Sequence, residues 1–298
     1  MARVGDDVAP PRRAPEGVQI AGIFDLLKLA ELLGKNVDDL ADAARSGDPG
    51  AWADNRVFMG LSNRPEVEVP DAFYGGPLQR FGSINEMMQS GPTLEDYLSS
   101  AGAPASDMLG SALADYRIGM APSPGFSAGV TNPEYVDLPD NTRRLLQPGF
   151  LVVNDQVPNT PEALRPLLAH EGTHVAQNVL DAPQGTNIAD ASLMSQYFEA
   201  TGAGPGSTFR QDLKSMLPPI QIGDLDRLAY IHSMGEAQAR AAQRRAGDEG
   251  LLSMMPTRED YAWNPYGLPF RSDLVYENTP QTLLDAQNWW RNRWRQNP

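Results

Sequence analysis

The stretch Pro161-Glu-Ala-Leu-Arg-Pro-Leu-Leu-Ala-His-Glu-Gly-Thr-His-Val-Ala-Gln-Asn-Val179 carries the pattern on which our interpretation of the chain depends. Its apolar residues recur at three- and four-residue steps, which predicts a helix with one buried side. His170 and His174 are four residues apart, so they lie one turn apart on one helix face and both imidazoles can reach the same metal ion. Glu171 lies one position further round, where it can act as a general base on a water beside that ion.

The histidine content of the chain supports a zinc site at this position. The chain has 3 histidines in 298 residues, and two of them are His170 and His174. The alternative, a polar turn on a helix surface, leaves this concentration of histidine unexplained. A zinc ion held by two histidines needs a third protein ligand. Because the chain has no cysteine, that ligand must be a histidine, an aspartate or a glutamate.

A second predicted helix, from about Asp224 to Arg245, offers the missing ligand. His232 and Glu236 are four residues apart on it and therefore share a face. We expect Glu236 to be the third zinc ligand, and His232 to lie near the reacting oxygen and to donate a proton or hydrogen bond to a developing oxyanion. The alternatives are that Glu236 pairs with Arg240 on the helix surface and that His232 is a buried imidazole without a catalytic role.

The segments around these helices predict an α+β fold with a small sheet. Gly149–Asn154 has four consecutive apolar residues between turn residues, and we expect it to form a strand that leads into the metal-binding helix. Shorter extended pieces are expected near 127–130 and 135–138. Further helices are expected near 20–33, 36–44, 83–90, 93–100, 104–116 and 191–200, and from Thr279 to the C-terminal end.

These patterns divide the chain into four regions. Residues 1–18 are rich in proline and are expected to be a flexible arm. Residues 19–115 are expected to be helical and irregular, and residues 116–265 to form the metal-binding domain. Residues 266–298 are expected to be a C-terminal extension with a helix rich in tryptophan and arginine.

Two motifs together resemble a known family of domains. Leu167-Leu-Ala-His-Glu-Gly-Thr-His-Val-Ala-Gln177 resembles the zinc-binding helix of zincin-type metallopeptidases. With Gly235-Glu-Ala-Gln-Ala-Arg-Ala-Ala-Gln-Arg244 it looks like the gluzincin-type metallopeptidase domains of phage polyvalent proteins and related toxins. The resemblance covers about residues 116–265. Gly172 departs from the pattern, because a glycine inside a helix costs about 1 kcal/mol relative to alanine.

The resemblance implies a zincin-like core and a zinc-dependent peptidase. In that family arrangement His170, His174 and Glu236 hold Zn²⁺, and Glu171 activates water for attack on the carbonyl of a protein or peptide substrate. Gln177 then either orients a ligand from behind or is a polar residue at the edge of the helix. The alternative function is a structural or internal protein of a phage virion, whose zincin domain binds metal but has little or no turnover.

Composition restricts the partners of the chain. The net charge of −14 argues against general nucleic-acid binding, because phosphates repel such a surface. No apolar run is long enough for a membrane span, and the charged, proline-rich N-terminus predicts no secretory signal. Together with these absences, the resemblance to phage-encoded domains implies a location in a virion or in the host cytoplasm. The predicted helices at 20–45 and the C-terminal Trp289, Trp290 and Trp294 are candidate contacts with other virion proteins, or with the rest of this chain.

Overall fold

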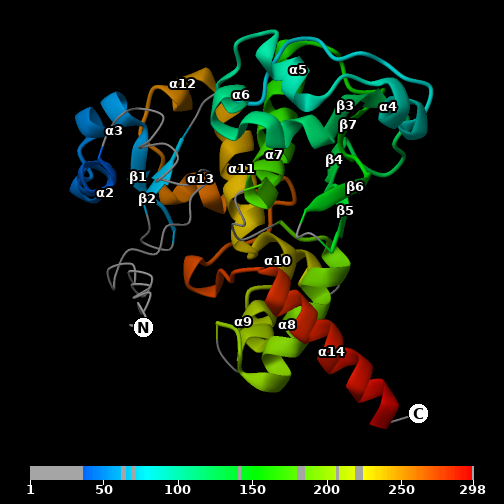
Figure 1. The fold of residues 1–298 in the computed structure, drawn as a ribbon. Coiled ribbons are helices and arrows are strands. Elements are labelled where there is room, and N and C mark those ends of the chain that lie inside the picture. The colour runs from blue at the N-terminus through cyan, green and yellow to red at the C-terminus, as the bar shows by residue number, and fades with distance from the viewer. Residues whose placement is uncertain are drawn as a thin grey trace, which may run out of the picture.

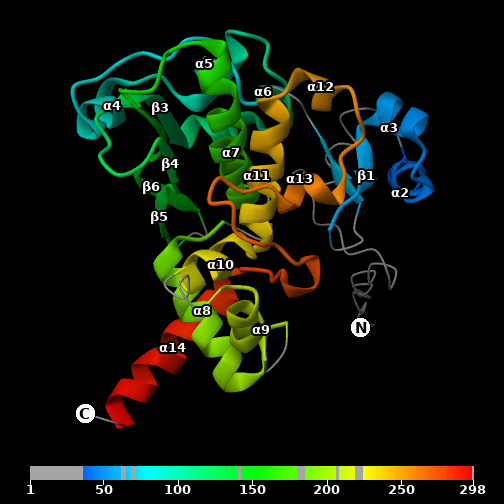
Figure 2. The same cartoon turned by 180° about the vertical axis from the view of Figure 1, so that it is seen from behind.

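A computed structural model describes residues 36–61, 65–68, 72–139, 142–179, 185–205, 208–218 and 224–296. The arm predicted for residues 1–18 and the helix predicted for residues 20–33 lie outside these ranges. Two long helices, α7 (Pro161–Val179) and α11 (Met234–Ala246), lie side by side through the middle of the molecule in both views (Figures 1 and 2).

A three-stranded sheet lies on one side of this helix pair. Its order is β3 (Tyr116–Ala121), β7 (Gly149–Asn154) and β4 (Ala128–Thr131), with β7 parallel to β3 and antiparallel to β4. The predicted strand at 149–154 is confirmed as the central strand, where Leu151, Val152 and Val153 are fully buried. The expected extended pieces correspond to β4 and to β5 (Glu134–Asp137), which pairs with β6 (Arg143–Gln147) in an exposed hairpin.

The opposite side of the helix pair carries an N-terminal unit of two helices and a hairpin (Figure 1). These elements are α2 (Val37–Ser46), α3 (Pro49–Asn55), β1 (Val57–Met59) and β2 (Pro65–Val67). The side chain of Asn36 caps α2, as predicted, and Gly47 ends it with a φ of 63°, a conformation that favours glycine. The apolar side of α2 is buried in the core of this same chain.

Short helices connect the N-terminal unit with the sheet. They are α4 (Ile84–Ser90), α5 (Leu94–Ser99), α6 (Pro104–Leu109) and a 3₁₀ helix (Gly110–Asp115), at the three places where helices were predicted. Leu94, Leu98 and Leu113 share one continuous core with the sheet and α7. Residues on both sides of position 115 therefore pack together.

A second core lies beyond the other end of the helix pair. It contains α8 (Ile188–Thr201), α9 (Phe209–Ser215), α10 (Leu225–Ile231) and the start of α14 (Pro280–Gln296). The predicted C-terminal helix is confirmed as α14. Ala286 is buried against this core and the ring of Trp289 lies 6.2 Å from that of Tyr197. The C-terminal end of α14 projects away from the rest of the described chain (Figures 1 and 2).

Three short helices complete the described elements: α12 (Glu249–Leu252), α13 (Arg258–Ala262) and a 3₁₀ helix (Ser272–Leu274). Together the elements make a mixed fold of helices and small sheets, compatible with the expected α+β class. None of the helices in the described ranges is long and apolar enough to cross a membrane.

The prediction of one continuous helix from Asp224 to Arg245 is wrong. Helix α10 ends at Ile231 and α11 begins at Met234, because Ser233 between them is extended, with φ −67° and ψ 133°. A distant segment holds this break open. The backbone N–H of Met234 donates to Tyr276 O (2.8 Å), and that of Tyr276 donates to His232 O (2.9 Å). A tertiary backbone pairing thus replaces the helical hydrogen bonds that the local sequence favours.

Candidate metal centre

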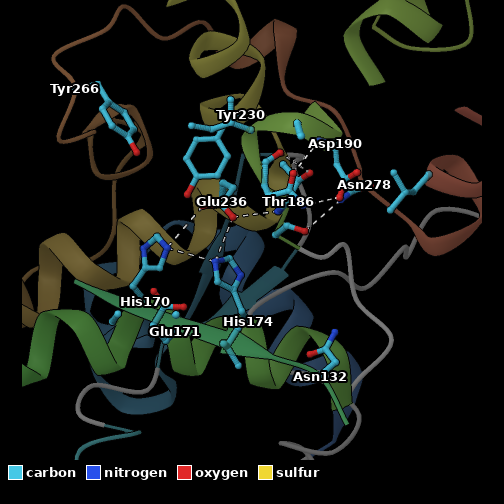
Figure 3. A pocket seen from close by; sticks show the side chains of 18 residues that line it. Asn132, His170, Glu171, His174, Thr186, Asp190, Tyr230, Glu236, Tyr266 and Asn278 are labelled. Atoms are coloured by element: carbon cyan, nitrogen blue, oxygen red, sulfur yellow. Dashed lines mark hydrogen bonds and ion pairs between the residues drawn. The ribbon is translucent and has the colours of Figure 1, made fainter. Parts of the chain in front are cut away.

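Three predicted ligand side chains converge between α7 and α11 (Figure 3). The Nε2 atoms of His170 and His174 lie 3.3 Å apart. Glu236 places Oε2 3.7 Å from His170 Nε2 and Oε1 3.3 Å from His174 Nε2. The three side chains are 13%, 12% and 3% exposed, so the donor atoms face one another and are largely screened from bulk water. This group could hold a metal ion.

The helix break described above positions Glu236. Ser233 is the N-cap of α11, so Glu236 lies in its first turn, where the helix dipole favours a negative charge. The two histidines come from the middle of α7, which packs along α11. The backbone N–H of Thr186 also donates to Glu236 Oε1 (3.1 Å) and holds the carboxylate in place.

His174 is oriented from behind by Gln177. The amide oxygen of Gln177 accepts from His174 Nδ1 at 2.9 Å and from the backbone N–H of Gly185 at 3.1 Å. Gln177 is fully buried, so it lies within the protein and not at an exposed helix edge. The sequence left two alternatives for Gln177, a position behind a ligand or a position at the edge of the helix. The structure places it behind His174, a candidate ligand.

Two glycines allow close approach at the centre. A Cβ at Gly185 would lie within 2.6 Å of His174 and Glu236, so a side chain there would collide with two of the candidate ligands. A Cβ at Gly172 would lie within 2.6 Å of the ring of Phe73, which packs across α7. The close packing of Phe73 therefore explains why position 172 is a glycine. The lower helix propensity of glycine is the free-energy cost of allowing the ring of Phe73 to approach α7.

The charge states of the ligands follow from burial and from their proximity. Burial lowers the pKa of His170 to about 3, and the neighbouring His174 acts in the same direction. Burial alone would lower the pKa of His174 too, but the Glu236 carboxylate outweighs it and the pKa is raised. Burial opposes ionisation of Glu236, yet His174 and His170 lower its pKa. Without metal, therefore, a proton on His174 balances the charge of Glu236.

A cavity of about 680 Å³ opens beside the three ligands. Glu171 lies on its wall, and burial raises the pKa of Glu171 from 4.5 to about 7. The other walls come from strand β4, the start of α8 and the end of α10. None of the described residues from 36 to 115 lines this cavity.

Two tyrosines on the cavity wall were missed by the sequence analysis. Tyr230 and Tyr266 line the cavity, and Figure 3 shows Tyr230 directed towards Glu236. Burial, reinforced by the charge of Glu236, raises the pKa of Tyr230 well above its usual value of 10. Its hydroxyl therefore stays protonated at neutral pH. The sequence held no signal for Tyr230, because residues six apart do not share a helix face and the break after α10 changes the direction of the side chain.

The structure does not bring His232 to the centre. His232 is fully buried, with Nδ1 2.7 Å from Leu228 O and with Nε2 accepting from the backbone N–H of Arg271 at 3.1 Å. Both ring nitrogens are thus bonded to backbone, and the ring stacks on Phe270. The expectation that His232 and Glu236 share a helix face fails because the two residues lie on either side of the break.

Arg240 has a different partner from the alternative considered for it. Its guanidinium is fully buried and donates to Ile231 O at the C-terminal end of α10. This contact ties the two halves of the broken helix together. Glu236, for its part, faces the two histidines and is not a surface residue.

Comparisons with protein-family models, with curated proteins and with solved structures find no match to this chain. The geometry of the centre therefore carries the functional argument.

Proposed function

We propose that this protein is a zinc-dependent metallopeptidase with a zincin-like core, in which Glu171 is the general base for hydrolysis of a peptide bond. The observation that carries the proposal is the convergence of His170, His174 and Glu236 at the wall of a cavity that also exposes Glu171. A partly buried carboxylate that faces a cavity beside a three-ligand centre is the arrangement that metal-assisted hydrolysis requires.

The separations between the donor atoms support zinc as the metal. Ligands about 2.0–2.1 Å from a tetrahedral ion lie roughly 3.3–3.4 Å from one another. Here the two Nε2 atoms lie 3.3 Å apart, and the nearest oxygens of Glu236 are Oε1, 3.3 Å from His174 Nε2, and Oε2, 3.7 Å from His170 Nε2. Two histidines and one carboxylate make a typical catalytic set, which leaves a fourth position for a reactant. Zinc held there would polarise a carbonyl oxygen and lower the pKa of water.

The proposed reaction assigns one proton relay to Glu171. Its carboxylate accepts a proton from the water whose oxygen bonds to the carbonyl carbon of the substrate. The C–N bond then breaks, and Glu171 returns the proton to the leaving amine. The raised pKa of Glu171, about 7, suits a group that must both accept and donate a proton near neutral pH.

Tyr230 supplies a hydrogen-bond donor for the same step. Its hydroxyl lies on the cavity wall, where it is hydrogen-bonded to Glu236, and it stays protonated because burial and the charge of Glu236 raise its pKa. A donor at this position can stabilise the negative charge that develops on the carbonyl oxygen. Tyr230 takes the role that the sequence suggested for His232.

The strand that lines the cavity favours an extended peptide as substrate. Ala128, Gly129 and Val130 of β4 line it, and β4 is the edge strand of its sheet in the described chain. An edge strand has unpaired backbone donors and acceptors on one side, which an extended peptide can pair with.

The test is cleavage of an unfolded protein by zinc-loaded Glu171→Gln. The amide cannot accept a proton, so we expect activity to fall by about 10²- to 10⁴-fold while zinc stays bound. Glu162→Gln is the matched control, because Glu162 lies in the first turn of the same helix and is exposed. Residual activity within a few-fold of the wild type contradicts the role of Glu171. A zinc-loaded wild type that cleaves no unfolded protein contradicts the proposed function.

A further inference from the structure

A chain of buried hydrogen bonds runs from the candidate ligand His174 to the N-terminal hairpin. Gln177 Oε1 accepts from His174 Nδ1 at 2.9 Å, and Gln177 Nε2 donates to Gln238 Oε1 at 3.1 Å. Gln238 Nε2 then donates to Glu66 Oε1 at 3.2 Å. Glu66 lies on β2, 172 residues before Gln238 in the sequence. Gln177, Gln238 and Glu66 are 0%, 1% and 0% exposed, so water does not compete for these bonds.

Glu66 determines which atom donates and which accepts at each step of this hydrogen-bond chain. Both carboxylate oxygens of Glu66 accept: Oε1 from Gln238 Nε2 and Oε2 from the hydroxyl of Tyr261. The NH₂ group of Gln238 must therefore face Glu66, which leaves its oxygen facing Gln177. The NH₂ group of Gln177 must in turn face Gln238, which leaves its oxygen facing His174.

The last bond of the chain decides the tautomer of His174. Because Gln177 presents an oxygen, His174 must carry a proton on Nδ1 to donate to it. In the neutral ring the lone pair is then on Nε2, the atom that lies 3.3 Å from Glu236 and from the other histidine. If both amides were turned round, Gln177 would present its NH₂ group to His174. The neutral ring would then have its lone pair on Nδ1 and a hydrogen on Nε2, so Nε2 could not bind a metal in that tautomer.

Two backbone groups favour the same orientation of Gln177. Its NH₂ group also donates to Gly235 O at 3.1 Å, and its oxygen also accepts from the N–H of Gly185 at 3.1 Å. All four partners of this amide thus agree. Agreement among partners from α7, α11 and the segment before α8 is what a preorganised ligand requires.

We infer that Glu66, Gln238 and Gln177 form a relay that holds His174 in its metal-binding tautomer, so that the N-terminal hairpin is part of the metal centre. The inference rests on the proposed function only in requiring that the centre binds zinc. The three relay residues are positioning residues and contact neither the metal nor a substrate.

The test removes the acceptor at position 66 in the full-length protein and compares the result with a variant that keeps one. In Glu66→Met, no acceptor faces the NH₂ group of Gln238, so the direction of the hydrogen-bond chain is lost. In Glu66→Gln, the amide oxygen can still accept from Gln238 while the hydroxyl oxygen of Tyr261 accepts from the new NH₂ group, so the direction is retained. Glu249→Gln on α12 is the control, since its carboxylate is 92% exposed.

Zinc affinity is measured against a competing chelator, and the exchange rate of the Nδ1 proton of zinc-bound His174 is measured by NMR on ¹⁵N-histidine protein. The 3 histidines make that spectrum simple to assign. We expect Glu66→Met to weaken zinc binding about 10-fold and to speed Nδ1 proton exchange, as for other residues behind metal ligands. We expect Glu66→Gln to keep both values within about threefold of the wild type.

The outcomes separate the relay from the proposed function. Wild-type values in Glu66→Met, or a Glu66→Gln protein as weak as Glu66→Met, overturn the relay. If Glu66→Met does not fold, Gln238→Met replaces it, and unchanged Nδ1 proton exchange in that variant overturns the relay. A wild type without zinc affinity contradicts the proposed function itself.

Discussion

Gly172 provides a sharp test of how α7 is packed. The residue lies between Glu171 and His174, and a Cβ there would lie within 2.6 Å of three ring atoms of Phe73. Phe73 is 3% exposed and belongs to the main core, so its ring has little room to move. We predict that Gly172→Ala destabilises the protein although alanine is the better helix former.

The expected magnitude follows from two opposing terms. Alanine gains about 1 kcal/mol over glycine inside a helix. Overpacking a core costs about 1–3 kcal/mol, and a contact this close belongs at the upper end of that range. The net change is a loss of about 1–2 kcal/mol in the free energy of unfolding.

The same substitution should have the opposite sign when the ring is absent. Phe73→Ala alone should cost about 3–5 kcal/mol, because it leaves a cavity in the core. In that background Gly172→Ala meets no ring and should stabilise by about 1 kcal/mol. The coupling between the two positions is then about 2–3 kcal/mol.

The assay is urea unfolding of the four proteins in the presence of a chelator, which keeps metal binding out of the comparison. A Gly172→Ala protein that is more stable than the wild type would refute the packing argument. Equal effects of Gly172→Ala in both backgrounds would refute it as well.

Three further predictions concern the ligands, the segment beside them and the C-terminal helix. The pKa of His174 is raised to about 9 and that of His170 is lowered to about 3, so between pH 7.5 and 8.5 zinc displaces one proton and not two. Its affinity should therefore rise about tenfold over this range in a competition titration, and a hundredfold rise would contradict the assignment. Gly185→Ala should weaken zinc binding at least about tenfold, since the new methyl group collides with His174 and Glu236, and an unchanged dissociation constant would show that this approach is unimportant. Trp289→Ala should lower the free energy of unfolding by about 1–3 kcal/mol and leave zinc affinity unchanged, because Trp289 packs on Tyr197. The comparison is Trp290→Ala, since Trp290 is 37% exposed, and a larger loss of stability in that variant would contradict the prediction.

Local periodicity accounts for the parts of the centre that were predictable. His170 and His174 needed only the geometry of one helix, and the strand at 149–154 needed only an apolar run between turns. Glu236 was identified from its residue type and from the second motif. Its neighbour His232 was misplaced because pairing with Tyr276, 44 positions away, breaks the helix between them.

The remaining parts depend on contacts that a local pattern cannot contain. Tyr230 and Gly185 reach the centre only through the packing of α10 and the segment before α8. Glu66 joins it across 172 residues, as a buried carboxylate on a three-residue strand. The sequence gives no signal for such a residue, because its role depends on the hydrogen-bond donors that surround it in the folded structure.

The central claim is that His170, His174 and Glu236 bind one zinc ion, and equilibrium zinc binding tests it most directly. The zinc content and dissociation constant of the wild type are compared with those of Glu236→Ala and Glu171→Gln, all prepared without chelator. The account predicts about one zinc per chain in the wild type and in Glu171→Gln, and a loss of at least about 100-fold in affinity in Glu236→Ala. A wild type without zinc, or a Glu236→Ala protein that binds zinc as tightly as the wild type, would contradict it.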